Sequence, residues 1–105
     1  MLHEAAPRAS VSPESILGVS VCGKPVALYD VDGEVIATTD ICPHSNCMLS
    51  SSGEAIDGIV ECCCHGSSYD LRTGENVMPP FSNPLTIYPS RVDNGMVLVD
   101  PGDAD

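Results

Sequence analysis

The stretch PVALYDVDGEVIATT, at residues 25–39, consists of two apolar segments joined by Asp32 and Gly33. An Asp-Gly pair between apolar runs is the strongest short signal for a β-hairpin, because its two-residue turn needs positive φ at both positions. No stretch of helical length shows the i, i+3, i+4, i+7 apolar spacing of an amphipathic helix. Similar apolar bursts beside turn residues are GVSVC (18–22), GIVEC (58–62), LTIYP (85–89) and MVLVD (96–100). We therefore expect an all-β fold of small antiparallel sheets, arranged like a sandwich or barrel.

Length and composition indicate one folded domain. The chain has 105 residues, of which 43% are hydrophobic, and its mean hydropathy of +0.10 differs from that of disordered proteins. We expect a flexible N-terminal segment at 1–14 and a single domain at 15–100, followed by an acidic tail at 101–105. Within the domain we expect two long loops, at about 40–55 and 62–84.

The charge excludes several classes of partner. Four Lys and Arg residues stand against 15 Asp and Glu residues, which gives a net charge of −11. Such a chain cannot supply the cationic surface that binds nucleic acid or anionic membranes. The sequence also contains no apolar run long enough to span a membrane and no apolar signal-peptide core near its start, so we expect a cytoplasmic protein.

The cysteines and histidines form the candidate site. Only 4% of the residues are aromatic, so the hydrophobic core is small and the fold needs a further source of stability. The chain offers Cys42-Pro43-His44 in one loop and Cys62-Cys63-Cys64-His65 in the other. Thiolate and imidazole are the ligands that hold zinc or an iron–sulfur cluster. A secreted disulfide framework and small buried cysteines are the alternatives that the residues leave open.

The two units resemble the signature of the Rieske [2Fe–2S] proteins. C-x-H is followed after 17 residues by C-x-x-H, and CCCHGSSYDLRTGE (62–75) is similar to the family pattern C-P-x-H-G-S-x-[FY]-D-x-x-T-G. The resemblance extends to the 25–35 hairpin and to the proline-rich stretch at 79–89, and it implies a Rieske fold with a cluster-binding subdomain of two loops. Position 63 departs from the pattern, because Cys63 replaces the usual proline. The implied ligands of one [2Fe–2S] cluster are Cys42 and Cys62 on one iron and His44 and His65 on the other.

The same resemblance implies roles for the neighbouring side chains. Cys47 and Cys64 match a pair that forms a disulfide between the two loops of some Rieske proteins. Ser67 and Tyr69 match hydroxyls that donate hydrogen bonds to cluster sulfur and so raise the reduction potential. We expect Cys22 to be a small buried residue near a strand end.

The resemblance also implies a function. A free-standing Rieske domain of this size is similar to the ferredoxin component of a ring-hydroxylating dioxygenase system, which is not itself an enzyme. Such a protein is a soluble, monomeric one-electron carrier from a flavin-dependent NAD(P)H ferredoxin reductase to a terminal Rieske oxygenase. The acidity either guides docking to basic patches on these partners or only maintains solubility. The alternatives are the small Rieske-like subunit of an assimilatory NADH nitrite reductase and a structural zinc module.

Overall fold

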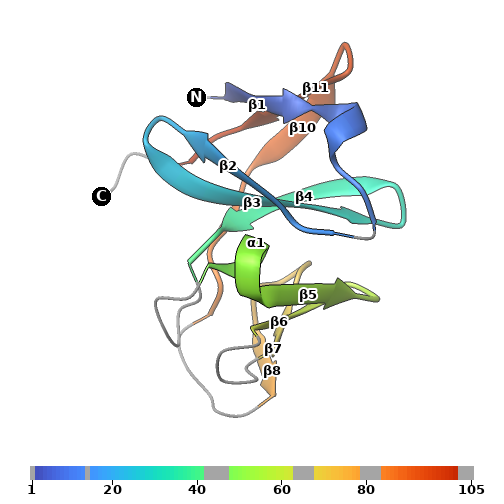
Figure 1. The fold of residues 1–105 in the computed structure, drawn as a ribbon, viewed down its shortest axis with the longest axis vertical. Coiled ribbons are helices and arrows are strands. Elements are labelled where there is room, and N and C mark those ends of the chain that lie inside the picture. Colours follow the sequence, from blue (N-terminus) through green and yellow to red (C-terminus); the bar gives the residue numbers. More distant parts are fainter. Residues whose placement is uncertain (1, 14, 42–47, 63–67, 79–83, 102–105) are drawn as a thin grey trace.

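Three antiparallel sheets make up almost the whole fold (Figure 1). The computed structural model describes residues 2–13, 15–41, 48–62, 68–78 and 84–101. The elements are β1 His3–Pro7, the 3-10 turn η1 Arg8–Ser10, β2 Leu17–Val21, β3 Lys24–Val31, β4 Glu34–Thr39, α1 Leu49–Ser52, β5 Gly53–Ile56, β6 Ile59–Cys62, β7 Ser68–Asp70, β8 Asn76–Met78, β9 Ile87–Tyr88, β10 Ser90–Asp93 and β11 Met96–Val99. This architecture confirms the all-β class.

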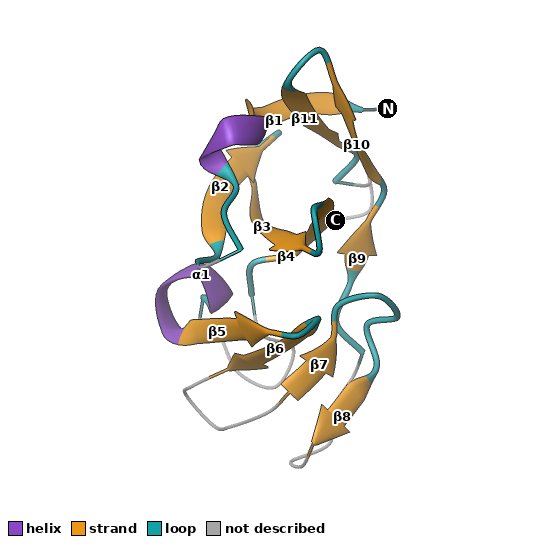
Figure 2. Cartoon of the chain, turned by 90° about the vertical axis from the view of Figure 1, so that its right-hand side faces the viewer, coloured by secondary structure: helices purple, strands orange, loops and turns teal. Residues whose placement is uncertain are grey.

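The three sheets are stacked along the long axis of the molecule (Figures 1 and 2). The terminal sheet has the order β1-β11-β10, the middle sheet β2-β3-β4-β9 and the third sheet β5-β6-β7-β8, here called the site sheet. The middle sheet lies between the other two, so it must bury side chains on both faces.

Strand β3 shows how the sequence meets this demand. Val26 and Leu28 belong to the core shared with the terminal sheet, whereas Ala27 and Tyr29 belong to the core shared with the site sheet. Alternate residues of a strand face opposite sides, so the nearly continuous apolar run of β3 is what a strand between two cores requires. The core on the site-sheet side contains Ala27, Tyr29, Val31, Ile36, Leu49, Val60, Cys62, Tyr69, Leu71 and Leu85.

Four hairpins close through two-residue turns that end in glycine. Both turn positions have positive φ, for example 53° at Asp32 and 85° at Gly33, as a type I′ turn requires. The Asp32-Gly33 turn confirms the sequence prediction, and Asn94-Gly95 forms the same kind of turn. Cys22 lies next to the end of β2, as expected, but the expected burial is wrong: it is exposed, because it occupies the first position of the β2–β3 turn.

The N-terminal residues differ from the expected flexible segment. β1 pairs with β11, and the buried side chain of Ala6 joins the core of the terminal sheet. Arg8 then ties this segment to the β3–β4 hairpin, since its guanidinium donates to Asp30 at 2.9 Å. That contact, together with the N–H of Gly33, lowers the pKa of the Asp30 carboxyl below its usual value. An acidic group held by a cation and an N–H donor favours its charged form.

The two expected loops also contain short regular elements. α1 and all of β5 except its last residue lie within 40–55, and β7 and β8 lie within 62–84. Each has only three or four residues, which is too short for a hydrophobic period to be visible in the sequence. These elements bring the ends of the two loops together.

Candidate metal centre

The chain leaves β6, enters β7 and leaves β8 at one end of the site sheet, the end where β5 begins. In this antiparallel sheet β5 begins at Gly53, opposite Cys62, where β6 ends. β7 begins at Ser68, which pairs with Met78 at the end of β8. The residues that flank 63–67 and precede 79–83 therefore lie at the same end. An isolated bridge between Ile41 and Met48 closes the base of the segment 42–47, immediately before α1 and β5.

Gly53 allows the two loop bases to pack against each other. A Cβ at this position would lie 2.8 Å from the carbonyl oxygen of Leu49 and 3.0 Å from that of Glu61. Backbone atoms cannot move aside cheaply, so only glycine fits here. Leu49 follows the first loop, and Glu61 directly precedes Cys62. Their close approach at Gly53 joins the end of one loop to the start of the other.

Two of the predicted site residues lie in described strands. Cys62 is the last residue of β6 and is fully buried, at 0% exposure, in the core that also contains Tyr69. Tyr69 is the middle residue of β7 and pairs with Val60. Within the described ranges no group of three His, Cys, Asp or Glu side chains could hold a metal ion. The other predicted site residues, Cys42, His44, Cys47, Cys64, His65 and Ser67, lie outside the described residues.

Asp40 is a site feature that the sequence reasoning missed. Its carboxylate is 1% exposed and accepts two hydrogen bonds from Ser50, from the N–H at 2.6 Å and from Oγ at 2.5 Å. Its carbonyl oxygen accepts from the N–H of Leu49 at 2.7 Å. Asp40 therefore ties the end of β4 to α1 across the first loop. The only signal in the sequence was an aspartate just before the C-x-H unit, and its partner is ten residues away.

The comparisons with known proteins agree with this arrangement. The family model described as the Rieske [2Fe–2S] domain matches residues 2–89. The chain belongs to the Rieske [2Fe–2S] family. The biphenyl dioxygenase ferredoxin subunit of Pseudomonas sp. (strain KKS102) is 41% identical over 90 residues, which are 86% of this chain and 83% of that protein.

Solved Rieske structures superpose along nearly the whole chain. The Sphingomonas yanoikuyae B1 ferredoxin has a TM-score of 0.89 and 33% identity, over 97% of this chain and 100% of that one. A complex of reduced oxygenase and oxidised ferredoxin in carbazole 1,9a-dioxygenase contains a chain with a TM-score of 0.84 and 29% identity, over 93% of this chain and 91% of that one. The relatives thus have almost the same extent as this chain.

The described residues fit a Rieske cluster at this end of the sheet. Cys62, a potential thiolate ligand of iron, is placed in a rigid strand and covered by apolar side chains on its core side. The base of the loop that carries Cys42 and His44 packs against the strand that ends in Cys62. Two loops that start this close together can supply ligands to one cluster.

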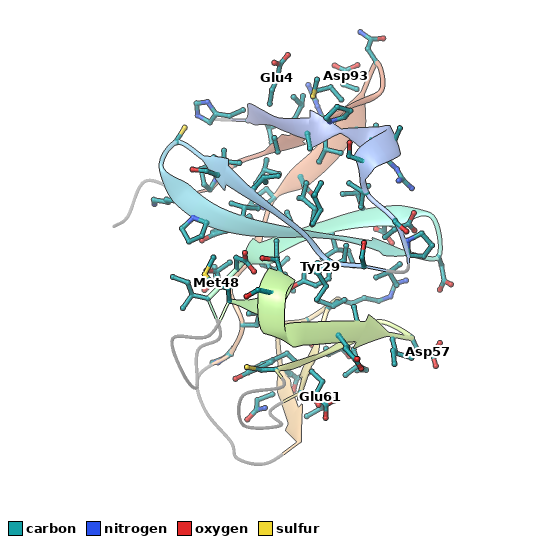
Figure 3. All side chains as sticks on the ribbon, in the orientation of Figure 1. Glu4, Tyr29, Met48, Asp57, Glu61 and Asp93 are labelled. Atoms are coloured by element: carbon teal, nitrogen blue, oxygen red, sulfur yellow. The ribbon has the colours of Figure 1, made fainter. Side chains whose placement is uncertain are left out.

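The surface beside this end of the Rieske domain is partly apolar. Ile41 and Met48, the two residues of the bridge, are 38% and 37% exposed. Met48 lies at this end in Figure 3, whereas Asp93 lies at the far end of the molecule. In the described part of the chain no helix is long and apolar enough to cross a membrane.

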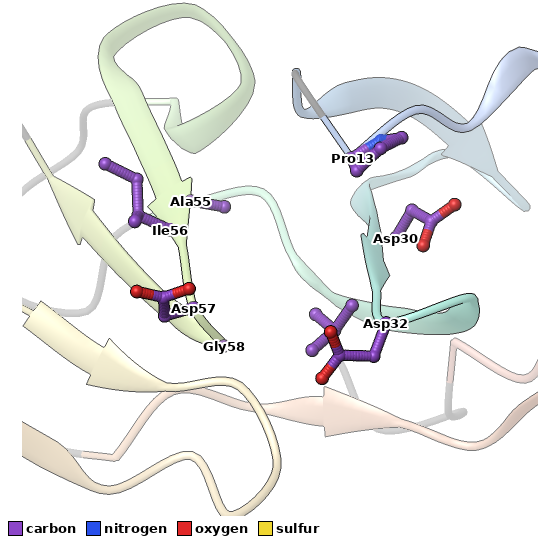
Figure 4. Close-up of a pocket in the computed structure, with 8 residues that line it drawn as sticks. Pro13, Asp30, Asp32, Ala55, Ile56, Asp57 and Gly58 are labelled. Atoms are coloured by element: carbon purple, nitrogen blue, oxygen red, sulfur yellow. The ribbon is translucent and has the colours of Figure 1, made fainter.

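The acidic cavity in Figure 4 is separate from the loops. It has a volume of about 310 Å³ and lies between the β3–β4 and β5–β6 hairpin tips. The carboxylates of Asp30, Asp32 and Asp57 line it. Because Asp57 lies in the turn after β5, the cavity is at the opposite end of the site sheet from Cys62. It is therefore not part of the candidate metal centre.

Proposed function

We propose that this chain is the ferredoxin of an aromatic-ring-hydroxylating dioxygenase system and carries single electrons to the terminal oxygenase. The observation that supports this most strongly is the match in extent: the chain covers 83% of the biphenyl dioxygenase ferredoxin subunit and 100% of the Sphingomonas ferredoxin. Both relatives are named as ferredoxins, and a ferredoxin carries electrons. We therefore infer that this chain acts as an electron carrier.

The proposed ligands are Cys42 and Cys62 on one iron and His44 and His65 on the other. Cys62 is held by β6, and the other three belong to segments whose flanking residues meet at the same end of the site sheet. When bound, the cluster accepts and releases one electron. Neutral histidine ligands raise its potential to roughly −150 to +300 mV, compared with about −400 mV for plant-type ferredoxins.

The protein supports Cys62 on its buried side. Leu49, Val60, Tyr69 and Leu71 are each fully buried in the same core as Cys62. These side chains exclude water from that side, and exclusion of water is one way in which a protein tunes the potential of a cluster. Because they are closely packed, we expect them to keep the ligand in place when the charge of the cluster changes.

We further propose roles for the remaining site residues. Ser67 and Tyr69 donate hydrogen bonds to cluster sulfur, and Cys47 and Cys64 form a disulfide between the two loops. The burial of Tyr69 in the same core as Cys62 supports its role. Donors that face sulfur stabilise the added electron, so both hydroxyls raise the potential.

The proposed partners are a flavin-dependent NAD(P)H ferredoxin reductase and a terminal Rieske oxygenase, with the chain acting as a monomer. The carbazole 1,9a-dioxygenase complex supports the oxygenase, since a chain similar to this one is there bound to an oxygenase. The half-exposed pair Ile41 and Met48 supports docking at the loop end, where a short path for the electron would lie.

A two-step assay with a biphenyl dioxygenase reductase and oxygenase tests the proposal. NADH-dependent reduction of cytochrome c should depend on added wild-type protein, and the dithionite-reduced protein should be reoxidised when mixed with the oxidised oxygenase. Cys62→Ser should abolish both reactions, while Cys22→Ser, a change in an exposed turn, should alter neither. Iron-loaded wild-type protein that fails in both steps would contradict the proposed function.

A further inference from the structure

The carboxylate of Asp40 is buried, and among the described residues its hydrogen-bond donors are all neutral. It is 1% exposed and accepts hydrogen bonds from the N–H and the hydroxyl of Ser50. A buried carboxylate without a cation is costly unless its oxygens are hydrogen-bonded. These bonds satisfy both oxygens and offset part of the charge, but they leave the net negative charge in place.

All four lysine and arginine side chains of the protein are engaged elsewhere. Arg8 bonds Asp30, and Lys24 donates to the carbonyl oxygen of Pro101. Arg72 pairs with Glu34, and Arg91 pairs with Asp93. In the part of the chain that the structure describes, no cation therefore compensates Asp40. An uncompensated buried charge in a small protein is a candidate functional group rather than a source of stability.

The fold leaves space for this carboxylate and its partner. A Cβ on Gly18 of β2 would contact Oγ of Ser50, and it would lie 2.8 Å from Cβ of Ser50 and 3.0 Å from Oδ2 of Asp40. Glycine at position 18 thus admits the Asp40–Ser50 pair into the space between β2 and α1. Gly18 belongs to β2, Ser50 belongs to α1 and Asp40 follows β4, so the pair is built into the tertiary structure.

The position of the charge points to its role. Asp40 lies two residues before Cys42, and its backbone carbonyl binds the residue that follows the Ile41–Met48 bridge. It therefore fixes both ends of the first ligand loop. A negative charge in a medium of low dielectric constant opposes the addition of an electron nearby, and no Lys or Arg within the described ranges screens it.

We propose that Asp40 is a positioning residue for the first ligand loop and that its buried charge lowers the reduction potential of the cluster. This inference rests on the proposed function, because it requires a cluster bound by Cys42 and His44. It assigns to Asp40 an effect opposite to that of hydroxyl donors that face the cluster sulfur. The two donors of Ser50 offset part of the charge of the carboxylate, so Ser50 weakens the effect of Asp40 on the reduction potential.

The midpoint potentials of three iron-loaded variants test the charge. Asp40→Asn keeps the shape and an oxygen acceptor but removes the charge, so its midpoint should shift to more positive values. Ser50→Ala removes one donor and leaves the carboxylate less neutralised, so its midpoint should shift to more negative values. Asp93→Asn removes the same charge from an exposed site at the far end of the molecule and should leave the midpoint unchanged.

The rate of iron loss to a chelator tests the positioning. Asp40→Ala removes the two hydrogen bonds between the carboxylate and Ser50, so iron loss should be about tenfold faster or more. Asp40→Asn should stay near the wild-type rate. If Asp40→Asn yields no iron-loaded protein, the direction of the Ser50→Ala shift in midpoint potential tests the role of the charge instead.

Two kinds of failure can be told apart. Equal midpoints for wild type, Asp40→Asn and Asp93→Asn would overturn the role of the charge, and so would a Ser50→Ala midpoint equal to that of wild type. An Asp40→Ala rate equal to the wild-type rate would overturn the positioning role. A wild-type protein that binds no iron would overturn the proposed function itself.

Discussion

Gly18→Ala should destabilise the protein, although alanine is normally better than glycine in a strand. Replacing a strand glycine by alanine gains roughly 0.5–1 kcal/mol from backbone entropy. Here the added methyl would contact Oγ of Ser50 and would lie 2.8 Å from its Cβ, so Ser50 must move away from Asp40. The change thus sets a small entropic gain against the loss of a buried interaction.

The structure gives the size of the loss. Moving the Ser50 side chain removes a hydrogen bond to a charged group, which costs roughly 1.5–3 kcal/mol, and overpacking costs roughly another 1–3 kcal/mol. We expect a net loss of roughly 2–5 kcal/mol in the free energy of unfolding. For a domain of this size the melting temperature should therefore fall by about 10 °C or more.

Thermal unfolding of the iron-loaded protein, followed by far-ultraviolet circular dichroism at one scan rate, measures this effect. Ser50→Gly is the matched background, because it removes both Ser50 atoms that the methyl would meet. In that background Gly18→Ala should cost far less, so the two changes should be strongly coupled. An unchanged or raised melting temperature for Gly18→Ala alone would refute the steric reasoning.

Three further predictions follow from other contacts. Asp30→Asn should lower the free energy of unfolding at neutral pH. The difference from wild type should disappear as the pH falls below the unfolded carboxyl pKa of about 3.9 and through the lower folded pKa of Asp30. A difference that stays constant in acid would count against the Arg8 contact. Tyr69→Phe should lower the midpoint potential. Tyr29 belongs to the same core, but its hydroxyl bonds Thr38 at 2.9 Å, so Tyr29→Phe should leave the midpoint unchanged. Equal midpoints for both variants and wild type would contradict the role proposed for Tyr69. If the net charge of −11 guides docking, the rate of reduction by the flavin reductase should fall as ionic strength rises, and a salt-independent rate would leave the acidity with a role in solubility only.

The parts of the fold that the sequence predicts are those with local signals. The Asp32-Gly33 and Asn94-Gly95 turns follow from neighbouring residues, and so do the apolar strands beside them. β1 was missed because its order comes from pairing with β11, more than 80 residues away in the chain. The sequence does not predict that Cys22 is exposed, because a cysteine beside an apolar strand gives no sign of whether its side chain is buried.

The candidate site divides in the same way. The spacing of the cysteines and histidines is a local pattern that the sequence shows directly, whereas the contacts that shape the loop bases are tertiary. Nothing near Asp40 in the sequence indicates Ser50 as its partner, and nothing near Gly18 indicates that both lie against it. Gly53 likewise carries no sign that two backbone carbonyls leave no space for a side chain. Such constraints arise only when separate elements pack.

We propose that this chain binds one [2Fe–2S] cluster through two cysteines and two histidines. Pulsed electron paramagnetic resonance of the dithionite-reduced protein, with spin quantitation and nitrogen hyperfine spectroscopy, tests it most directly. We predict one unpaired electron per chain and strong couplings to the nitrogens of two imidazoles, because both histidines bind one iron. A protein without an iron signal, or a cluster without nitrogen couplings, would contradict the claim.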